Sequence, residues 1–236
     1  MKVKVMGFSG AYPAANGACS GYLVSDGDTR LMLDFGSGVL PRLMALMDPA
    51  DLSAIVMSHW HYDHASDLLP LAYYIEINKL RLRLVAPAEP QPLRQLIAER
   101  SFELRSLAET GEAGGLRLES HPVKHPVPAY ALKLTNAQGK VIVYTGDAVG
   151  GEGLKDFCRE ADLLICDAAF TRAQWNPNLP HFSAAQAGEL ARDANAKRLM
   201  ITHFMPGADV KTLLKEAREA FPDAFPARLD LTVDIE

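Results

Sequence analysis

The segment SHWHYDH at residues 58–64 holds four potential metal ligands in seven positions. The chain has seven histidines, and three of them lie here, directly after the apolar run AIVM at 54–57. A short apolar run of this kind is typical of a buried strand. Imidazole nitrogens and carboxylate oxygens are ligands of divalent metals. We expect a metal site where this strand leaves the core, because a polar loop with accidental histidines would not explain the density and spacing.

The spacing inside this segment favours two neighbouring metal ions over one. Alternation along the chain lets His59 and His61 point one way, while the adjacent Asp63 and His64 face a second position. A single ion could hardly be reached by all four side chains without severe backbone strain. Two ions need more ligands than this segment offers, so other parts of the chain must supply them.

Two other apolar runs end in potential ligands. KVIVY at 140–144 continues into TGD, which ends at Asp147, and KRLMI at 197–201 continues into TH, which ends at His203. Alone, Asp147 would suggest a plain turn aspartate, and His203 could be a buried histidine that only forms hydrogen bonds. Both structural explanations weaken once the first cluster requires partners. We therefore expect these two residues to join the metal centre.

The composition is that of an ordinary globular protein. Of 236 residues, 48% are hydrophobic and 22% are charged, which is enough for a single large core. The net charge of −5 disfavours nucleic acid as a partner, because such proteins usually carry a basic surplus. Three cysteines without a CxxC pair predict free thiols in a reducing compartment. No apolar run approaches the ~20 residues of a membrane span, so we expect a cytoplasmic protein that does not enter membranes.

Strands followed by helices recur in both halves of the chain, roughly 1–113 and 114–236. This order predicts a single α/β domain (α+β in some schemes), an αββα four-layer sandwich with two sheets inside and helices outside. Periodicity alone does not separate this sandwich from other layered α/β folds. The pattern also predicts a helix from the prolines at 90 and 92 to about residue 106. Ser183 and Gln186 form a capping-box pattern before a second helix.

The order of motifs resembles the metallo-β-lactamase fold superfamily. H-x-H-x-D-H at 59–64 is similar to the signature of that superfamily, and the resemblance extends along nearly the whole chain. GFSGAYP, LDFGSG, HPVPAYAL, YTGD and LARDANAKRLMITHF follow in an order that looks most like the ribonuclease Z-like branch of phosphodiesterases. The resemblance implies the same αββα sandwich that the strand pattern suggests.

The resemblance also implies a division of ligands between two metal ions. It places His59, His61 and His125 on one ion, Asp63, His64 and His203 on the other, and Asp147 as the bridge. His121 competes with His125 on chemistry alone, and the family pattern H-x-V-P-x-Y selects His125. The ions are expected to be zinc, and manganese or iron would also suit these nitrogen and oxygen ligands.

Two such ions would acidify a bridging water, so a phosphodiesterase of this kind needs no protein nucleophile. The expected catalytic residues are Asp63, Asp147 and His181, the last as the proton donor to the leaving group. Asp167 could hold His181 in the right tautomer, with a structural cap as the alternative. Asp34 could orient a metal-bound histidine, with a simple turn as the alternative.

Two residues near the histidines are expected to have structural roles. Cys19 should be buried as a small apolar residue, and Trp60 should pack the histidine loop.

The substrate is expected to be a small or cyclic phosphodiester. Ribonuclease Z carries a long arm for transfer RNA between its third histidine and the bridging aspartate, whereas only 21 residues lie between His125 and Asp147 here. Thioester, lactone and β-lactam hydrolases, an RNA-processing nuclease and a non-enzymatic metal-binding module remain alternatives on the same scaffold. A homodimer is expected by analogy with the branch alone.

Overall fold

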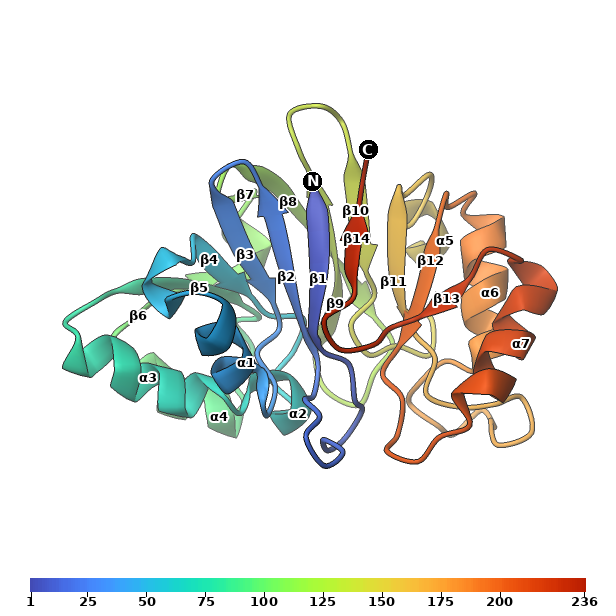
Figure 1. The fold of residues 1–236 in the computed structure, drawn as a ribbon, viewed down its shortest axis with the longest axis horizontal. Helices are drawn as coiled ribbons and strands as arrows, with labels where there is room; N and C mark the ends of the chain where they lie inside the picture. The colour runs from blue at the N-terminus through green and yellow to red at the C-terminus, as the bar shows by residue number, and fades with distance from the viewer.

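Two β-sheets face each other in the middle of the molecule, and helices cover their outer faces (Figure 1). The computed structural model describes all 236 residues. In Figure 1 helices α1, α3 and α4 lie on the left of the sheets, and α6 and α7 lie on the right. The predicted αββα sandwich is confirmed.

Each sheet has seven strands and mixes parallel with antiparallel pairs. The first sheet has the order β14-β1-β2-β3-β4-β5-β6. Its strands are β1 Lys2–Gly7, β2 Gly21–Asp26, β3 Thr29–Leu33, β4 Ala54–Val56, β5 Leu82–Ala86, β6 Phe102–Ser106 and β14 Thr232–Asp234. The second sheet has the order β13-β12-β11-β10-β9-β8-β7. Its strands are β7 Glu112–Ala113, β8 Leu116–Val123, β9 Ala129–Thr135, β10 Val141–Tyr144, β11 Leu163–Asp167, β12 Leu199–Thr202 and β13 Phe225–Pro226.

Seven α-helices and two short 3₁₀ turns connect the strands. They are α1 Val39–Leu46, α2 Tyr62–Ala65, α3 Leu68–Ile77, α4 Pro92–Ala98, α5 Leu154–Phe157, α6 Ala184–Asp193, α7 Val210–Ala220, η1 Pro49–Asp51 and η2 Leu107–Glu109. The capping box at the start of α6 is present, with Ser183 and Gln186 bonded to each other's backbone. No helix has both the length and the apolar character needed to cross a membrane.

The helix predicted to run to residue 106 is wrong in its second half. Helix α4 ends at Ala98, and residues 102–106 form β6, which pairs in parallel with β5 over five residues. Pairing with β5 outweighs the helical preference of this short, charged segment, and no local signal carries that information.

The last strand of the chain returns to the first sheet. β14 pairs with β1 in antiparallel orientation, while β7 at residues 112 and 113 already belongs to the second sheet. The sheets therefore differ slightly from the halves at 1–113 and 114–236. Pairing with β14 satisfies the backbone edge of β1, which would otherwise be exposed.

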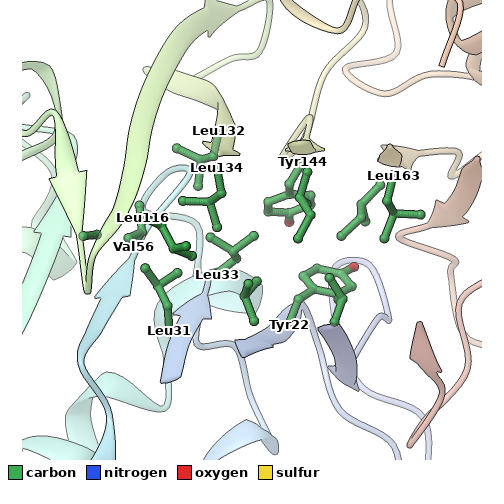
Figure 2. Close-up of a cluster of buried hydrophobic side chains, with 14 of the residues drawn as sticks. Tyr22, Leu31, Leu33, Val56, Leu116, Leu132, Leu134, Tyr144 and Leu163 are labelled. Carbon is green, nitrogen blue, oxygen red and sulfur yellow. The ribbon is translucent and has the colours of Figure 1, made fainter. Parts of the chain in front are cut away.

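A layer of apolar side chains fills the space between the sheets, as Figure 2 shows. Leu31 and Leu33 of β3 point into this layer, while Met32 between them points to the helices on the other face. This is the alternation of a strand that is buried on both sides. The rings of Tyr22 and Tyr144 meet across the two sheets with centroids 5.0 Å apart. The central layer thus fixes the two sheets against each other and holds the strand ends in register.

Candidate metal centre

Residues that follow β4, β10 and β12 meet at one edge of the sandwich, together with Asp167 at the end of β11. This edge is the lower one in Figure 1, where α2 lies. His59 follows β4, His61 precedes α2, and the first turn of α2 carries Asp63 and His64. The first of these strand ends therefore delivers four potential ligands, as the density of SHWHYDH predicts.

Three histidines converge on one point. His61 Nδ1 lies 3.1 Å from His59 Nε2 and 3.0 Å from His125 Nε2. Nitrogens bound to one tetrahedral zinc ion would be about 3.3 Å apart. Asp147 Oδ2 lies 3.6 Å from His59 Nε2 and 3.9 Å from His125 Nε2. These four side chains have the types and spacing of a metal-binding set.

A second set lies beside the first. Asp63 Oδ2 lies 3.6 Å from His64 Nε2 and 3.8 Å from His203 Nε2. Asp147 Oδ1 lies 3.1 Å from His64 Nε2 and 3.2 Å from His203 Nδ1. The two oxygens of Asp147 therefore face different sets, as expected for a bridging carboxylate. All seven residues proposed from the sequence as ligands meet here, whereas His121 bonds to the Glu152 carbonyl elsewhere.

Unsatisfied polar atoms in the centre fit a cation. His64 Nε2 and Asp147 Oδ1 are buried, and although they lie 3.1 Å apart, neither forms a hydrogen bond. Native proteins rarely leave such atoms unpaired, and metal coordination would satisfy both. The donor set of imidazole nitrogens and carboxylate oxygens suits divalent ions. The residues present therefore fit divalent metal binding.

Burial and neighbouring charges set the protonation of the ligands. Burial lowers the pKa of His59 well below its usual range and the pKa of His125 to about 4, so both imidazoles are neutral. Burial would also lower the pKa of His64, but nearby carboxylates, Asp147 first, outweigh it and raise that pKa well above its usual range. The first set thus presents the neutral form that binds metals, and the second set attracts positive charge.

The sequence left two roles possible for Asp34, and the structure shows that it contacts the candidate ligands on the side that faces away from the centre. His64 Nδ1 donates to Asp34 Oδ2 at 2.7 Å, which leaves Nε2 free for the centre. The Ser58 hydroxyl also donates to Asp34 Oδ2 at 2.7 Å and lies 3.0 Å from His59 Nδ1. Ser58 was missed in the sequence, although it directly precedes His59. One buried carboxylate therefore orients ligands of both sets.

Asp63 and His125 are positioned by the backbone. Asp63 Oδ2 accepts a 2.7 Å hydrogen bond from the Ala11 amide, in the loop between β1 and β2. His125 Nδ1 donates to the Pro180 carbonyl at 3.1 Å, which directs Nε2 to the first set. Neither partner carries a side-chain signal, so sequence reasoning could not find them.

Two site residues adopt left-handed backbone. Asp34 has a φ of +57° and His203 has a φ of +65°. Such a conformation is unfavourable by about 1 kcal/mol or more for residues other than glycine, and it tends to occur at functional positions. The surrounding fold holds both residues in place because their side chains have defined partners.

His181 borders the centre and is held by Asp167. Its Nδ1 donates to Asp167 Oδ2 at 2.8 Å and lies 3.9 Å from Asp147 Oδ2. Asp167 also accepts hydrogen bonds from the Ala148 and Ala169 amides, which fix its orientation. Burial alone would lower the pKa of His181, but the Asp167 carboxylate outweighs it and raises that pKa to about 9. No protein group bonds to Nε2, so this atom is available to a ligand.

A cavity of about 240 Å³ opens onto the centre, and we name it the His181 cavity. His61, Asp63, Asp147, His181 and His203 line one part of it, and Ala11, Ala169, Phe170 and Met205 line the other. The apolar wall was not identified from the sequence. Its size suits a small group rather than a large ligand.

Cys19 and Trp60 lie outside the ligand sets. Cys19 is fully buried, and burial raises the pKa of its thiol to about 12, so it packs as an apolar residue. Trp60 is buried and donates to the Pro87 carbonyl at 3.0 Å. Both residues have the packing roles expected from the sequence.

Comparison with known proteins identifies similar chains over nearly the full length. The family described as "Beta-lactamase superfamily domain" matches residues 29–204. The "Probable metallo-hydrolase YhfI" of Bacillus subtilis is 32% identical over 232 residues, which covers 94% of each chain. The crystal structure of that metallo-β-lactamase fold protein has a TM-score of 0.91, with 29% identity and 98% of each chain covered.

Ribonuclease Z proteins are also similar. The one from Methanopyrus kandleri is 25% identical over 99% of this chain and 97% of its own. The crystal structure of the short form of human tRNase Z has a TM-score of 0.82 at 21% identity, and all of both chains is covered. That second likeness shows a shared fold.

Proposed function

The chain belongs to the metallo-β-lactamase fold superfamily, in its ribonuclease Z-like branch, and on that premise we propose a dinuclear metal-dependent phosphodiesterase. The proposed ligands are His59, His61, Asp63, His64, His125, Asp147 and His203. Asp63, Asp147 and His181 are the proposed catalytic residues. The metal ions are proposed to be zinc, and manganese or iron would fit the same ligands.

The arrangement of Asp147 carries the proposal. Its two oxygens face two separate sets of histidines, at 3.6 Å from His59 Nε2 and 3.1 Å from His64 Nε2. A single ion would leave one of these sets, and one oxygen of a buried carboxylate, without a partner. Two ions that share Asp147 use every ligand.

The metal pair would supply an acidified water and would stabilise the charge that develops on a phosphoryl group. His181 would donate a proton to the leaving oxygen, because its Nδ1 is tied to Asp167 and its Nε2 is free. Asp63 would be held in place for its set by the Ala11 amide. Phe170 and Met205 would exclude water from one side of the substrate.

The size of the His181 cavity favours a small substrate over transfer RNA. Its volume is about 240 Å³. The segment between His125 and Asp147 contains β9, a turn and β10, so it has no room for an RNA-binding arm. We therefore favour a small phosphodiester. The free, buried cysteines suit a cytoplasmic location, and a homodimer remains an expectation by analogy.

A panel of substrates tests the reaction class. Protein of measured metal content would be incubated with a cyclic nucleotide, bis(p-nitrophenyl) phosphate, a precursor transfer RNA, a thioester, a lactone and a β-lactam. Preferred turnover of the small diesters supports the proposal. Preferred turnover of the RNA, thioester, lactone or β-lactam would assign the site to that class, and loaded protein that hydrolyses none of them would be a binding module.

The Asp147→Ala variant tests the shared ligand. We expect it to lose metal and to lose hydrolysis of bis(p-nitrophenyl) phosphate by about a thousandfold or more, because both ions depend on it. Asp156→Ala is the control, since Asp156 is exposed on α5. Unchanged metal content and turnover in the Asp147 variant would remove the bridging assignment.

A further inference from the structure

A second cavity of about 230 Å³ lies next to the centre, between the start of α2 and the start of α4. We name it the Tyr62 cavity, and its lining residues are Trp60, His61, Tyr62, Gln91, Pro92 and Leu93. None of these residues except His61 belongs to the proposed metal sets. Both helices lie at the lower edge of the molecule in Figure 1.

His61 connects the two cavities, because it lines both of them. Its Nδ1 faces the first ligand set, 3.1 Å from His59 Nε2. Its Nε2 has no hydrogen-bond partner in the protein. In His59, His64 and His125, by contrast, the ring nitrogen that faces away from the ligand sets does have a partner. A ligating histidine normally donates its second N–H to a partner, so this N–H is available to a molecule bound at the junction.

The walls of the Tyr62 cavity suit a flat aromatic group. Of its lining residues, Trp60 and Leu93 are buried, whereas Tyr62 is 69% exposed. An exposed aromatic ring that lines a cavity offers a surface on which a second ring can stack. Stacking between an aromatic side chain and a nucleobase is a common form of such contact.

Gln91 adds a polar group to this apolar surface. It stands at the residue before α4, and its side chain makes no hydrogen bond to the helix or to any other protein group. A primary amide offers two donors and one acceptor. It can therefore pair with the edge of a heteroaromatic ring that carries adjacent donor and acceptor atoms.

We propose that the Tyr62 cavity binds the non-leaving ester group of the substrate, and that this group carries a heteroaromatic ring of the nucleobase type. The ring stacks on Tyr62, and its edge bonds to Gln91. This inference rests on the proposed phosphodiesterase function. It narrows the substrate to an open-chain diester with two separate arms.

The position of His181 assigns the two arms to the two cavities. His181 lines the His181 cavity and does not line the Tyr62 cavity. The ester oxygen that receives the proton from His181 must lie in the His181 cavity, so the leaving group occupies that cavity. The other ester arm then extends past His61 into the Tyr62 cavity. In the reaction the phosphorus–oxygen bond on the His181 side breaks, water supplies the new oxygen, and the Tyr62 arm stays on the phosphate.

Three diesters with one leaving group test this assignment on the metal-loaded protein. They are methyl p-nitrophenyl phosphate, bis(p-nitrophenyl) phosphate and thymidine 5′-(p-nitrophenyl phosphate), which differ only in the non-leaving arm. We expect kcat/KM to rise from the methyl to the thymidine ester. In Tyr62→Ala, kcat/KM for the thymidine ester should fall about tenfold, with less than a twofold change for the methyl ester.

Gln91→Ala should also affect the thymidine ester selectively, by about fivefold. Tyr73→Ala and Gln95→Ala are matched controls, because both residues are exposed and line neither cavity. An equal loss with all three diesters, or no loss with any, would overturn the proposal. Equal loss would indicate a structural effect, and no loss would place the ring elsewhere.

Direct binding separates failure of this subsite from failure of the reaction. The affinities of thymidine 5′-monophosphate and methyl phosphate for the metal-loaded protein would be measured by calorimetry. We expect Tyr62→Ala to weaken only the nucleotide, by about tenfold. If the wild type hydrolyses no diester, the proposed function fails, and this comparison alone decides whether the cavity binds the ring. Unchanged nucleotide affinity in the variant would overturn the subsite.

Discussion

Asp34 Oδ2 accepts a hydrogen bond of 2.7 Å from His64 Nδ1, and both residues are completely buried. The same carboxylate accepts from Ser58, whose hydroxyl lies against His59 Nδ1. The proton on each ring is therefore held on the nitrogen that faces away from the centre. Each Nε2 is directed to the centre, so Asp34 orients a candidate ligand in each set without entering either one.

Replacing Asp34 with Asn should weaken metal binding without removing a ligand. The amide keeps the size of the carboxylate but loses its charge and one acceptor oxygen. We expect metal affinity to fall roughly 10- to 100-fold, as for other partners of ligating histidines. Competition with a chromophoric chelator would measure the change.

Tyr144→Phe is the matched control for this variant, because the Tyr144 hydroxyl also donates to Asp34 Oδ2, at 2.9 Å. It removes one bond to the carboxylate and leaves both histidine contacts in place. Equal losses of affinity in the two variants would indicate that loosening of Asp34, rather than control of the tautomers, is responsible.

Removing the metal should lower the melting temperature. A ligand at 100 times its Kd stabilises the folded state by about 2.7 kcal/mol, which corresponds to about 5–10 °C for a chain of this length. Calorimetry before and after chelation, and again after zinc is restored, would measure this shift. In Asp147→Ala the chelator should have a much smaller effect, and equal shifts in both proteins would contradict the central place of Asp147.

Most of the candidate ligands could be predicted from the residues alone because they follow short apolar runs, whereas His125 and the division into two sets came from the family resemblance. Strands that cross a core must emerge at its edge, so the ends at His59, Asp147 and His203 were candidates to meet. The order of predicted strands and helices along the chain likewise predicted the αββα layers. These features are encoded within a few neighbouring residues.

The remaining features depend on contacts between distant segments. The Ala11 amide that bonds to Asp63 lies 52 residues away in the sequence, and an amide carries no residue-specific signal. The Tyr62 cavity likewise depends on how α4 packs beside α2. The mistaken extension of α4 has the same cause, because β6 forms through pairing with β5.

Gly10 gives a test that acts on the second ligand set alone. A Cβ at this position would lie 2.6 Å from His203 Cδ2 and 2.7 Å from its Nε2, so the imidazole would have to move. We expect Gly10→Ala to reduce bound metal from two ions to about one for each chain, as measured by elemental analysis. Gly111→Ala is the control, since nothing lies within 4 Å of its added Cβ. Two ions retained in Gly10→Ala would show that His203 is dispensable or able to shift.

The contact between His181 and Asp167 predicts how the enzyme responds to its leaving group. p-Nitrophenolate departs without a proton, so His181→Ala should lower kcat for the hydrolysis of methyl p-nitrophenyl phosphate by less than about tenfold. Methyl phenyl phosphate, which lacks the nitro group, needs a proton on its leaving oxygen. His181→Ala should therefore lower kcat for its hydrolysis by about 100-fold or more, since general acid catalysis contributes 10²–10⁴.

Asp167→Asn should have the same selectivity as His181→Ala but a smaller effect, because the histidine remains and only its orientation and charge are disturbed. The measurement is the slope of log kcat against leaving-group pKa over a series of aryl methyl phosphates, with metal content determined for each variant. A steeper slope in both variants at full metal loading fits proton donation by a His181 that Asp167 holds. Parallel lines would mean that His181 positions the substrate or supports the fold, and the proton would then have to come from another group.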